Sequence, residues 1–348
     1  MKALFFSSSL LFFLFSCKKT EQNIAKEEVI ISQNVHFKED INTLNLTSGK
    51  FNIALKKSLL PLKKVIFLNS SLIGYMTELG LEDKIIGVSN PEYIYSDKIH
   101  QLIKAGKIQN VGSEQKYDVE KIISLKPDAV LTNYIASFEN TYELLKKNGI
   151  TIIFLDEYLE QKPLEKSAYL KLYGKLFGIE KKSDSLYTVI EKNYNQLKAE
   201  ALRSKDKPEI ICNEMYGNQW FVPGGKSFAA QYFKDANASY PWMSLPNENS
   251  VPLSFEEVFA KSSKATYWVN VGEYKKKSEL LAFNPVYAKL HPFKNGKVYS
   301  LYGSVKGKSN DYFASGVVRA DKVLHDYINI FHPHLLKDSA LVYMKELK

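Results

Sequence analysis

The chain has 348 residues, of which 45% are hydrophobic and 24% charged, fractions typical of a soluble globular protein with room for two domains. Its net charge of +9 comes from lysines that are spread along the chain and mixed with acidic residues, and its only arginines are Arg203 and Arg319. A nucleic-acid-binding protein gathers its positive charge, usually with arginine, into one patch. The composition therefore argues against nucleic-acid binding.

Residues 1–16 have the pattern of a secretory signal peptide. Lys2 precedes an apolar run over residues 3–15, which is shorter than the ~20 residues needed to cross a bilayer, and Ser16 is the small residue typical of a cleavage site. Cys17 follows and resembles the cysteine of a bacterial lipobox, which becomes the lipidated first residue of the mature protein. Phe15 is bulkier than usual at its position, so an ordinary cleaved signal peptide is the alternative. A lipid anchor at Cys17 predicts a protein held at a membrane in the periplasm. We also expect the protein to be a monomer.

Residues 17–40 are polar and charged, and we expect a lipidated N-terminus followed by a flexible tether. Residues 41–57 alternate around "TSGK", which predicts a hairpin. From residue 64 on, short apolar runs at 64–69, 84–89, 129–132 and 150–156 alternate with helical patterns. This alternation predicts a parallel sheet covered by helices on both faces, forming an N-terminal lobe over residues 41–163.

The pattern then changes. Residues 164–206 carry no strand signal and read as linking helices, with Gly178 ending the first and Pro208 following the second. Strands and helices resume in a C-terminal lobe over residues 207–333, and residues 334–348 are expected to be a tail. Cys212 lies in the apolar run "EIICNEM" and is expected to be a buried, unpaired thiol, because a lipidated Cys17 leaves it no disulfide partner.

One local pattern occurs in both lobes. "DVEKIISLKPDAV" from Asp118 aligns without a gap on "SFEEVFAKSSKAT" from Ser254, and both place a glutamate two residues after a helix-capping residue, at Glu120 and Glu256. Ser254 and Glu257 also fit a capping box. A carboxylate in the first helical turn is ordinary helix-start chemistry. Its matched placement in both lobes suggests instead two acidic contacts for a two-subunit partner with basic pockets.

The order and spacing of these motifs resemble the class III solute-binding proteins of ABC importers, which bind cobalamin, ferric siderophores and haem. The resemblance covers about residues 63–335, including "KVIFLNSSLIGYMTELGLEDKIIGVS", "VGSEQKYDVEKIISLKPDAVL" and "FVPGGKSFAAQYFKDANA". It implies an α/β fold of two Rossmann-like lobes with parallel sheets, joined by a long helical backbone with a ligand cleft between them. It also implies that Glu120 and Glu256 dock on the permease dimer. The second motif departs from the family pattern at Ser263 and Lys264.

Ligands of open parallel sheets lie beyond the carboxyl ends of the strands. The loops expected there are rich in aromatic residues, whose flat rings can stack on a chelate or macrocycle. Tyr95, Tyr158, Tyr274 and Tyr312 are in such loops. The predicted ligand contacts are Tyr93, Tyr134, Met215, Tyr216, Trp220 and Tyr302.

The six histidines form no motif on opposed strand ends, so we predict no protein-held metal and no cofactor, and a metal that arrives already chelated. Arginines often line the siderophore clefts of this family, and here only Arg319 could approach the cleft. Ferric siderophore, haem and corrinoid therefore all stay open as ligands, with a ferric siderophore favoured.

Two other functional classes fit the sequence less well. "PGGKS" at residues 223–227 lacks the first glycine of a P-loop, because that position is Trp220, and no nucleophile-elbow motif occurs. A lipid-anchored periplasmic enzyme is therefore the less favoured reading. A surface adhesion or structural lipoprotein would not need two lobes with an aromatic cleft.

Overall fold

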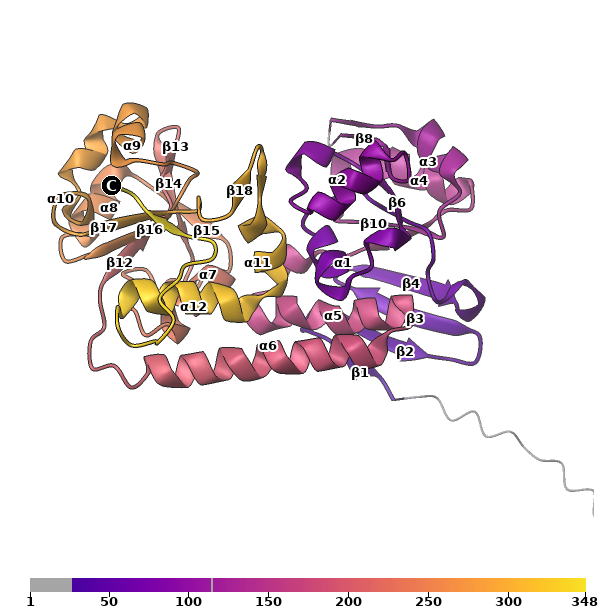
Figure 1. The fold of residues 1–348 in the computed structure, drawn as a ribbon, viewed down its shortest axis with the longest axis horizontal. Helices are drawn as coiled ribbons and strands as arrows, with labels where there is room; N and C mark the ends of the chain where they lie inside the picture. The colour runs from indigo at the N-terminus through magenta and orange to yellow at the C-terminus, as the bar shows by residue number, and fades with distance from the viewer. Residues whose placement is uncertain (1–26, 114) are drawn as a thin grey trace, which may run out of the picture.

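The computed structural model describes residues 27–113 and 115–348, so the predicted signal peptide and the lipidation site at Cys17 lie outside the described residues. Two α/β lobes stand side by side and are joined along one side by long helices (Figure 1). The predicted fold class, two lobes with parallel sheets on a helical backbone, is confirmed. In the described part of the chain, no helix is both long and apolar enough to cross a membrane.

The N-terminal lobe contains a five-stranded parallel sheet in the order β11-β10-β5-β6-β7. Its strands are β5 (Val65–Phe67), β6 (Ile85–Val88), β7 (Gln109–Asn110), β10 (Ala129–Thr132) and β11 (Thr151–Phe154), with a small ribbon formed by β8 (Gly112–Ser113) and β9 (Lys116–Tyr117). Its helices are α1 (Ile73–Leu79), α2 (Asp97–Lys104), α3 (Val119–Leu125) and α4 (Glu139–Lys147). The central strands are buried along their whole length, as expected for a sheet covered on both faces.

The predicted hairpin is part of a larger antiparallel sheet, made of β1 (Val29–Ile30), β2 (Val35–Glu39), β3 (Thr43–Ser48) and β4 (Phe51–Lys56). Residues 29–39 were predicted to belong to the tether, and the structure corrects this. Val35 and Phe37 alternate with polar neighbours along β2 and are buried, with Leu44 and Leu46 of β3 in the same core. Burial of this apolar face explains why the segment is ordered as strand.

The C-terminal lobe has two sheets. Strands β12 (Ile210–Cys212), β16 (Tyr267–Val271) and β17 (Lys297–Ser300) are parallel, and β13 (Met215–Tyr216), β14 (Gln219–Pro223) and β15 (Ser250–Leu253) form an antiparallel sheet. A further hairpin is formed by β18 (Val305–Lys306) and β19 (Ser309–Asn310). The helices are α7 (Phe228–Asp235), α8 (Phe255–Lys261), α9 (Lys277–Phe283), α10 (His291–Asn295), α11 (Ser315–Val318) and α12 (Ala320–Phe331).

The last residues are not a separate tail, as was predicted for 334–348. They form β20 (Lys345–Glu346), which pairs antiparallel with β17. Tyr343, Met344 and Leu347 are each at most 2% exposed and belong to the core of the C-terminal lobe. Burial of these three apolar side chains fixes the C-terminus against the sheet edge.

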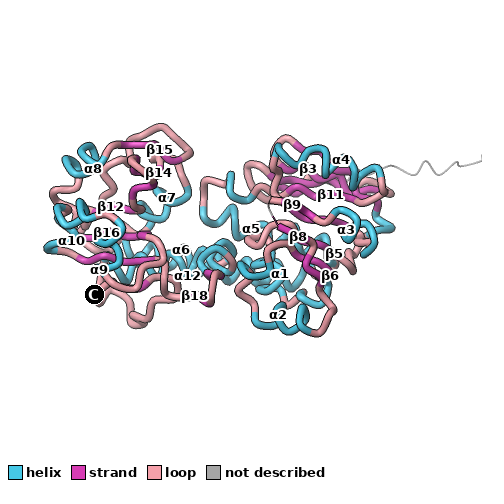
Figure 2. The backbone as a smooth tube through the Cα atoms, turned by 90° about the horizontal axis from the view of Figure 1, so that it is seen from above, coloured by secondary structure: helices cyan, strands magenta, loops and turns pink. Residues whose placement is uncertain are grey.

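Two long helices, α5 (Pro163–Phe177) and α6 (Glu180–Ala201), join the lobes within the predicted linking segment, and α12 packs beside α6 (Figures 1 and 2). Gly178 ends α5 in the left-handed conformation with φ of 68°. The short helix α11 packs on α1 of the other lobe, where a Cβ atom at Gly74 would lie 2.3 Å from the carbonyl oxygen of Ala314. This close contact holds the segment before α12 against the N-terminal lobe.

Candidate functional site

Two adjoining cavities of about 540 and 410 Å³ lie between the lobes and share the side chains of Tyr158, Phe228, Tyr312 and Phe313. In the N-terminal lobe, the loops after β5, β10 and β11 line them. In the C-terminal lobe, residues at or just after the ends of β12, β16 and β17 do so. The lining residues thus come from the carboxyl ends of both parallel sheets, which is where open α/β sheets bind their ligands.

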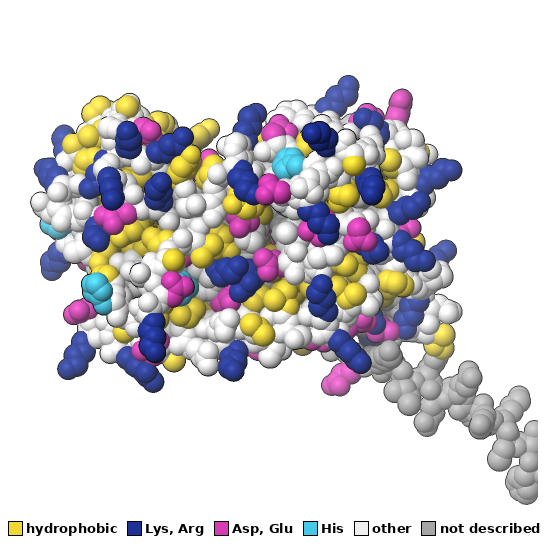
Figure 3. Space-filling view, viewed as in Figure 1, with side chains coloured by type: hydrophobic (Ala, Val, Ile, Leu, Met, Phe, Trp, Pro, Cys, Tyr) yellow, Lys and Arg dark blue, Asp and Glu magenta, His cyan; other side chains and the backbone are white. Residues whose placement is uncertain are grey.

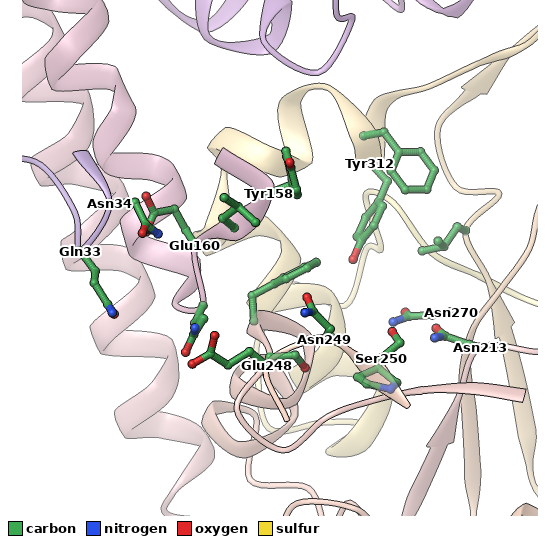
Figure 4. Close-up of a pocket in the computed structure, with 18 residues that line it drawn as sticks. Gln33, Asn34, Tyr158, Glu160, Asn213, Glu248, Asn249, Ser250, Asn270 and Tyr312 are labelled. Carbon is green, nitrogen blue, oxygen red and sulfur yellow. The ribbon is translucent and has the colours of Figure 1, made fainter. Parts of the chain in front are cut away.

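Aromatic rings form much of the shared wall. Tyr158, which follows β11, is 52% exposed, and Phe313, which precedes α11, is 55% exposed. Figure 4 shows Tyr158 and Tyr312 projecting into the space between the elements that carry them. Rings of this size left half open to solvent provide a surface on which a flat ligand can stack.

A buried carboxylate lies at the N-terminal wall of the smaller cavity. Glu157 is 3% exposed; its Oε1 accepts a hydrogen bond from Ser71 Oγ at 2.6 Å and its Oε2 accepts one from Asn133 Nδ2 at 2.8 Å. Burial raises the pKa of Glu157, and the two hydrogen bonds oppose that rise. These three polar side chains are therefore held in fixed orientations facing the cavity.

Lys166 of α5 lines the same cavity from the helical backbone and is 8% exposed. Its Nζ lies 3.6 Å from the centroid of the Phe228 ring, across the lobe boundary. Burial lowers the pKa of Lys166 to about 8, and the negative charges of Glu157 and Glu160 partly oppose this shift. The cavity therefore contains a cation whose desolvation is only partly compensated.

Polar side chains line about half of the larger cavity. Glu160 accepts hydrogen bonds from Ser32 Oγ at 2.5 Å, Tyr169 Oη at 2.9 Å and Asn34 Nδ2 at 3.2 Å, so the segment before β2 is tied to the cavity wall. Figure 4 shows Gln33, Asn34 and Glu160 on one side of this space and Asn213 and Asn270 on the other. The antiparallel N-terminal sheet thereby contributes amide groups to the interlobe space.

A second contact between the lobes is made by the β18–β19 hairpin. Lys306 Nζ lies 2.6 Å from Asp97 Oδ2 of the N-terminal lobe and 4.4 Å from the centroid of the Tyr95 ring. Lys308 Nζ lies 5.8 Å from the Tyr93 ring centroid. In Figure 1 the hairpin stands between the two lobes. The predicted ligand contact Tyr93 is thus placed at this hairpin and not among the side chains lining the cavities.

Trp220, a predicted ligand contact, lies in the core of the C-terminal lobe and not among the side chains that line the two cavities. Its side chain is 0% exposed, its Nε1 donates to the carbonyl of Cys212 at 2.9 Å, and its ring packs on Trp268 and Tyr287. Met215 is also buried in this core, at 9% exposure. An indole in a loop and an indole in a core strand look alike in sequence, and here the residue lies in β14, paired with β15.

Tyr134, Tyr216 and Tyr302 also lie outside the lining of both cavities. Tyr134 packs on Phe51 of the N-terminal sheet, with Lys50 Nζ 4.0 Å from its ring centroid. Tyr216 is 83% exposed in the β13–β14 hairpin, and the Tyr302 ring faces Lys275 Nζ at 5.1 Å. A ligand contact by any of these three stays a prediction.

Sequence reasoning did find Tyr158 and Tyr312 as loop aromatics, but it missed Lys166, Phe228, Glu157 and the interlobe amides. Phe228 directly follows the Ser227 cap of α7, whose Oγ accepts a hydrogen bond from the Ala230 amide, and reads as an ordinary helix start. The sequence gives no signal for Lys166, because the burial of its helix around most of the circumference follows from the packing of the lobes. A lysine there is unusual and marks a side chain with a special environment.

Glu120 and Glu256 lie in the first turns of α3 and α8, in opposite lobes (Figure 1), and both are exposed. Neither side chain has a hydrogen-bond or ion-pair partner within residues 27–113 and 115–348. The caps predicted for both helices are present: Asp118 accepts from the Lys121 amide, and Ser254 and Glu257 form a capping box. Helix capping is therefore performed by other side chains, and both glutamates are left facing solvent.

Four further features concern surface charge, metal binding and the free thiol. Arg319 is paired with Asp321 and Glu78 and lines a pocket beside α6 and α12, but neither of the two cavities described above. Figure 3 shows lysine and arginine side chains scattered over this face of both lobes without a single dominant patch. Within the described residues, no group of three or more His, Cys, Asp or Glu side chains is placed to hold a metal ion. Cys212 is free and buried, and burial raises the pKa of its thiol to about 12.

Comparison with known proteins relates this chain to a known family. A family model described as periplasmic binding protein matches residues 65–304, which leaves the sheet β1–β4 outside the match. An uncharacterized ABC transporter substrate-binding lipoprotein of Bacillus subtilis is 30% identical over 156 residues, which are 44% of this chain and 46% of that protein.

Solved structures share the fold. A possible iron-binding periplasmic solute-binding protein from Staphylococcus epidermidis matches with a TM-score of 0.61 at 20% identity, covering 78% of this chain and 99% of the other. A periplasmic haem-binding protein from Pseudomonas aeruginosa matches with a TM-score of 0.62 at 17% identity, covering 82% and 98%. Because the family model covers more than half of the sequence and the two-lobed fold agrees with it, the chain belongs to the class III periplasmic binding protein family.

Proposed function

We propose that this protein is the substrate-binding lipoprotein of an ABC importer, and that it captures a ferric siderophore between its lobes and delivers it to a permease dimer. The observation that carries this proposal is the pair of interlobe cavities lined by aromatic rings and amides, in a chain of this family. Their sizes are within the ~300–1,000 Å³ range of small-molecule sites. A binding role is thereby favoured over the alternative of a lipid-anchored enzyme.

The side chains suit the organic surface of a chelate. Tyr158, Phe228, Tyr312 and Phe313 offer ring faces, and Asn133, Asn213 and Asn270 offer amide donors and acceptors. A siderophore surrounds its iron with its own oxygen atoms, so the protein needs to contact only the outside of the complex. Rings for stacking and amides for hydrogen bonding are sufficient for that task.

Haem is the second candidate, with cobalamin as a further member of the same ligand class. One similar structure is that of a haem-binding protein, and a porphyrin could lie between the rings of Tyr158 and Tyr312. Titrating the protein separately with a ferric siderophore, haemin and cobalamin would rank the three ligands. We expect the ferric siderophore to bind most tightly.

Replacing Tyr158 by alanine should weaken the affinity for the preferred chelate roughly tenfold, or ~1.4 kcal/mol, because a stacking ring is lost from the shared wall. The ring is half exposed, so the melting temperature should change little. Tyr216→Ala is the matched control, since it removes a more exposed tyrosine that lines neither cavity. Quenching of intrinsic fluorescence on titration measures both affinities. A larger loss in the Tyr216 variant than in the Tyr158 variant would move the site to the β13–β14 hairpin.

The lipid anchor is proposed at Cys17, outside the described residues. Changing Cys17 to serine removes the acceptor of the lipid, so the variant should leave the membrane fraction and appear in the soluble exported fraction. Cys212→Ala is the control, because Cys212 is buried in the C-terminal lobe and its loss should not affect anchoring. Fractionation followed by immunoblotting makes the measurement. Continued membrane association of the Cys17 variant would reject the lipid anchor at this residue.

A further inference from the structure

Lys166 is a buried cation that has no polar partner in the described part of the protein. Its side chain is 8% exposed and lines the 410 Å³ cavity together with Asn69, Ser71 and Asn133. Within residues 27–113 and 115–348, its Nζ makes no hydrogen bond or ion pair, and it lies over the face of the Phe228 ring, 3.6 Å from the centroid. A ring face stabilises an ammonium ion but leaves its N–H donors without acceptors.

The neighbouring carboxylates do not act as its partners. Glu157 accepts hydrogen bonds from Ser71 and Asn133, and Glu160 accepts them from Ser32, Asn34 and Tyr169. Neither carboxylate forms an ion pair with Lys166, although both act on it at longer range. An ammonium ion largely removed from water without a hydrogen-bonded counter-ion is costly for the ligand-free protein. An acceptor that enters the cavity would remove that cost.

We propose that Lys166 receives an anionic oxygen atom of the ligand, so that the cleft selects negatively charged chelates over uncharged ones of similar size. This inference rests on the proposed function and names the chemical class of its ligand. Lys166 is carried by the helix that joins the lobes, and Phe228, which contacts its ammonium group, is carried by the C-terminal lobe. The anion would therefore bind at the base of the cleft, where both lobes meet the helical backbone.

The test compares two iron complexes that differ in charge. A ferric tris-catecholate is a trianion, and a ferric trishydroxamate is uncharged. Lys166→Met keeps the length of the side chain and removes the charge. We expect the variant to bind the tris-catecholate at least tenfold more weakly than the unmodified protein, and to bind the trishydroxamate within about twofold, because a charge-assisted hydrogen bond is lost only with the anion.

Lys171→Met is the matched control. Lys171 lies on the same helix and also contacts a ring face, with its Nζ 4.2 Å from the Tyr187 ring centroid, but it does not line the cavity. Its replacement should leave both affinities unchanged. Loss of affinity for the anionic complex in both variants would overturn the assignment of the site to Lys166.

Thermal unfolding of the ligand-free protein separates a binding role from a structural one. Because Lys166 is an unpaired buried cation, Lys166→Met should melt at the same temperature as the unmodified protein or higher. A lower melting temperature together with equal losses for both iron complexes would show a structural role and overturn the inference. If the unmodified protein binds neither complex, the proposed function fails and this inference fails with it.

Discussion

Replacing Glu120 and Glu256 together by alanine is expected to abolish uptake of the chelate while leaving its affinity for the isolated protein unchanged. Both carboxylates are exposed, one on each lobe, and neither lines the interlobe cavities. Their interaction with the helix dipole is worth only ~0.3–1 kcal/mol each, so the fold should survive the change. Two acidic contacts on opposite lobes fit a permease dimer that presents one basic pocket per subunit.

Transport of an iron-labelled chelate into cells that express the complete importer measures the effect, and a titration of the purified variant measures its affinity. The matched control is a double variant at Glu143 and Glu279, which are exposed glutamates on α4 and α9 of the same two lobes. This control should transport normally. Normal uptake by the Glu120 and Glu256 double variant would remove the docking role from these residues.

Trp220→Ala is expected to lower the free energy of unfolding by ~3–5 kcal/mol, because a fully buried indole is replaced by a cavity. The indole fills the space beside Trp268 and Tyr287, with ring centroids 5.5 and 5.7 Å away, and its N–H is bonded to the Cys212 carbonyl. The loss should therefore appear as instability of the C-terminal lobe and not as a selective loss of ligand affinity.

Urea unfolding followed by circular dichroism measures this change in stability. Tyr216→Ala serves as the control because Tyr216, on the facing strand of the same hairpin, is 83% exposed. Its replacement should alter stability by no more than ~0.5 kcal/mol. A stable Trp220 variant with weakened chelate binding would instead restore the tryptophan to the ligand site.

Local features of the fold were predictable because they depend on neighbouring residues. The run "AVLT" is β10, the helix before it is capped by Asp118 and ends before Pro127, and Ser254 begins the equivalent helix of the second lobe. Hydrophobic periodicity, helix capping and the helix-ending effect of proline each depend on only a few neighbouring residues. They can therefore be predicted without knowing the tertiary structure. The same reasoning placed the helical link between the lobes.

Features that depend on distant partners were not predictable from these local rules. Residues 35–39 form β2 because they pair with β3, and residues 345–346 form β20 because they pair with β17. Which aromatic rings face the cleft depends on how each loop packs. The sequence alone therefore could not show that Tyr158 lines the cavities while Trp220 is buried in the core. Lys166 reads as a common helix lysine, and only the packing of the lobes around α5 reveals its burial.

The central claim is that this protein binds a metal chelate between its lobes. Its absorption spectrum tests this claim most directly. The spectrum is recorded on the protein isolated from its own membranes, and again after incubation with a ferric siderophore and removal of free ligand. We predict a retained charge-transfer band in the visible region at one chelate per protein, and its loss when the cavity ring of Tyr158 and the charge of Lys166 are removed together. A colourless protein that retains neither a ferric siderophore, haem nor cobalamin would contradict the account.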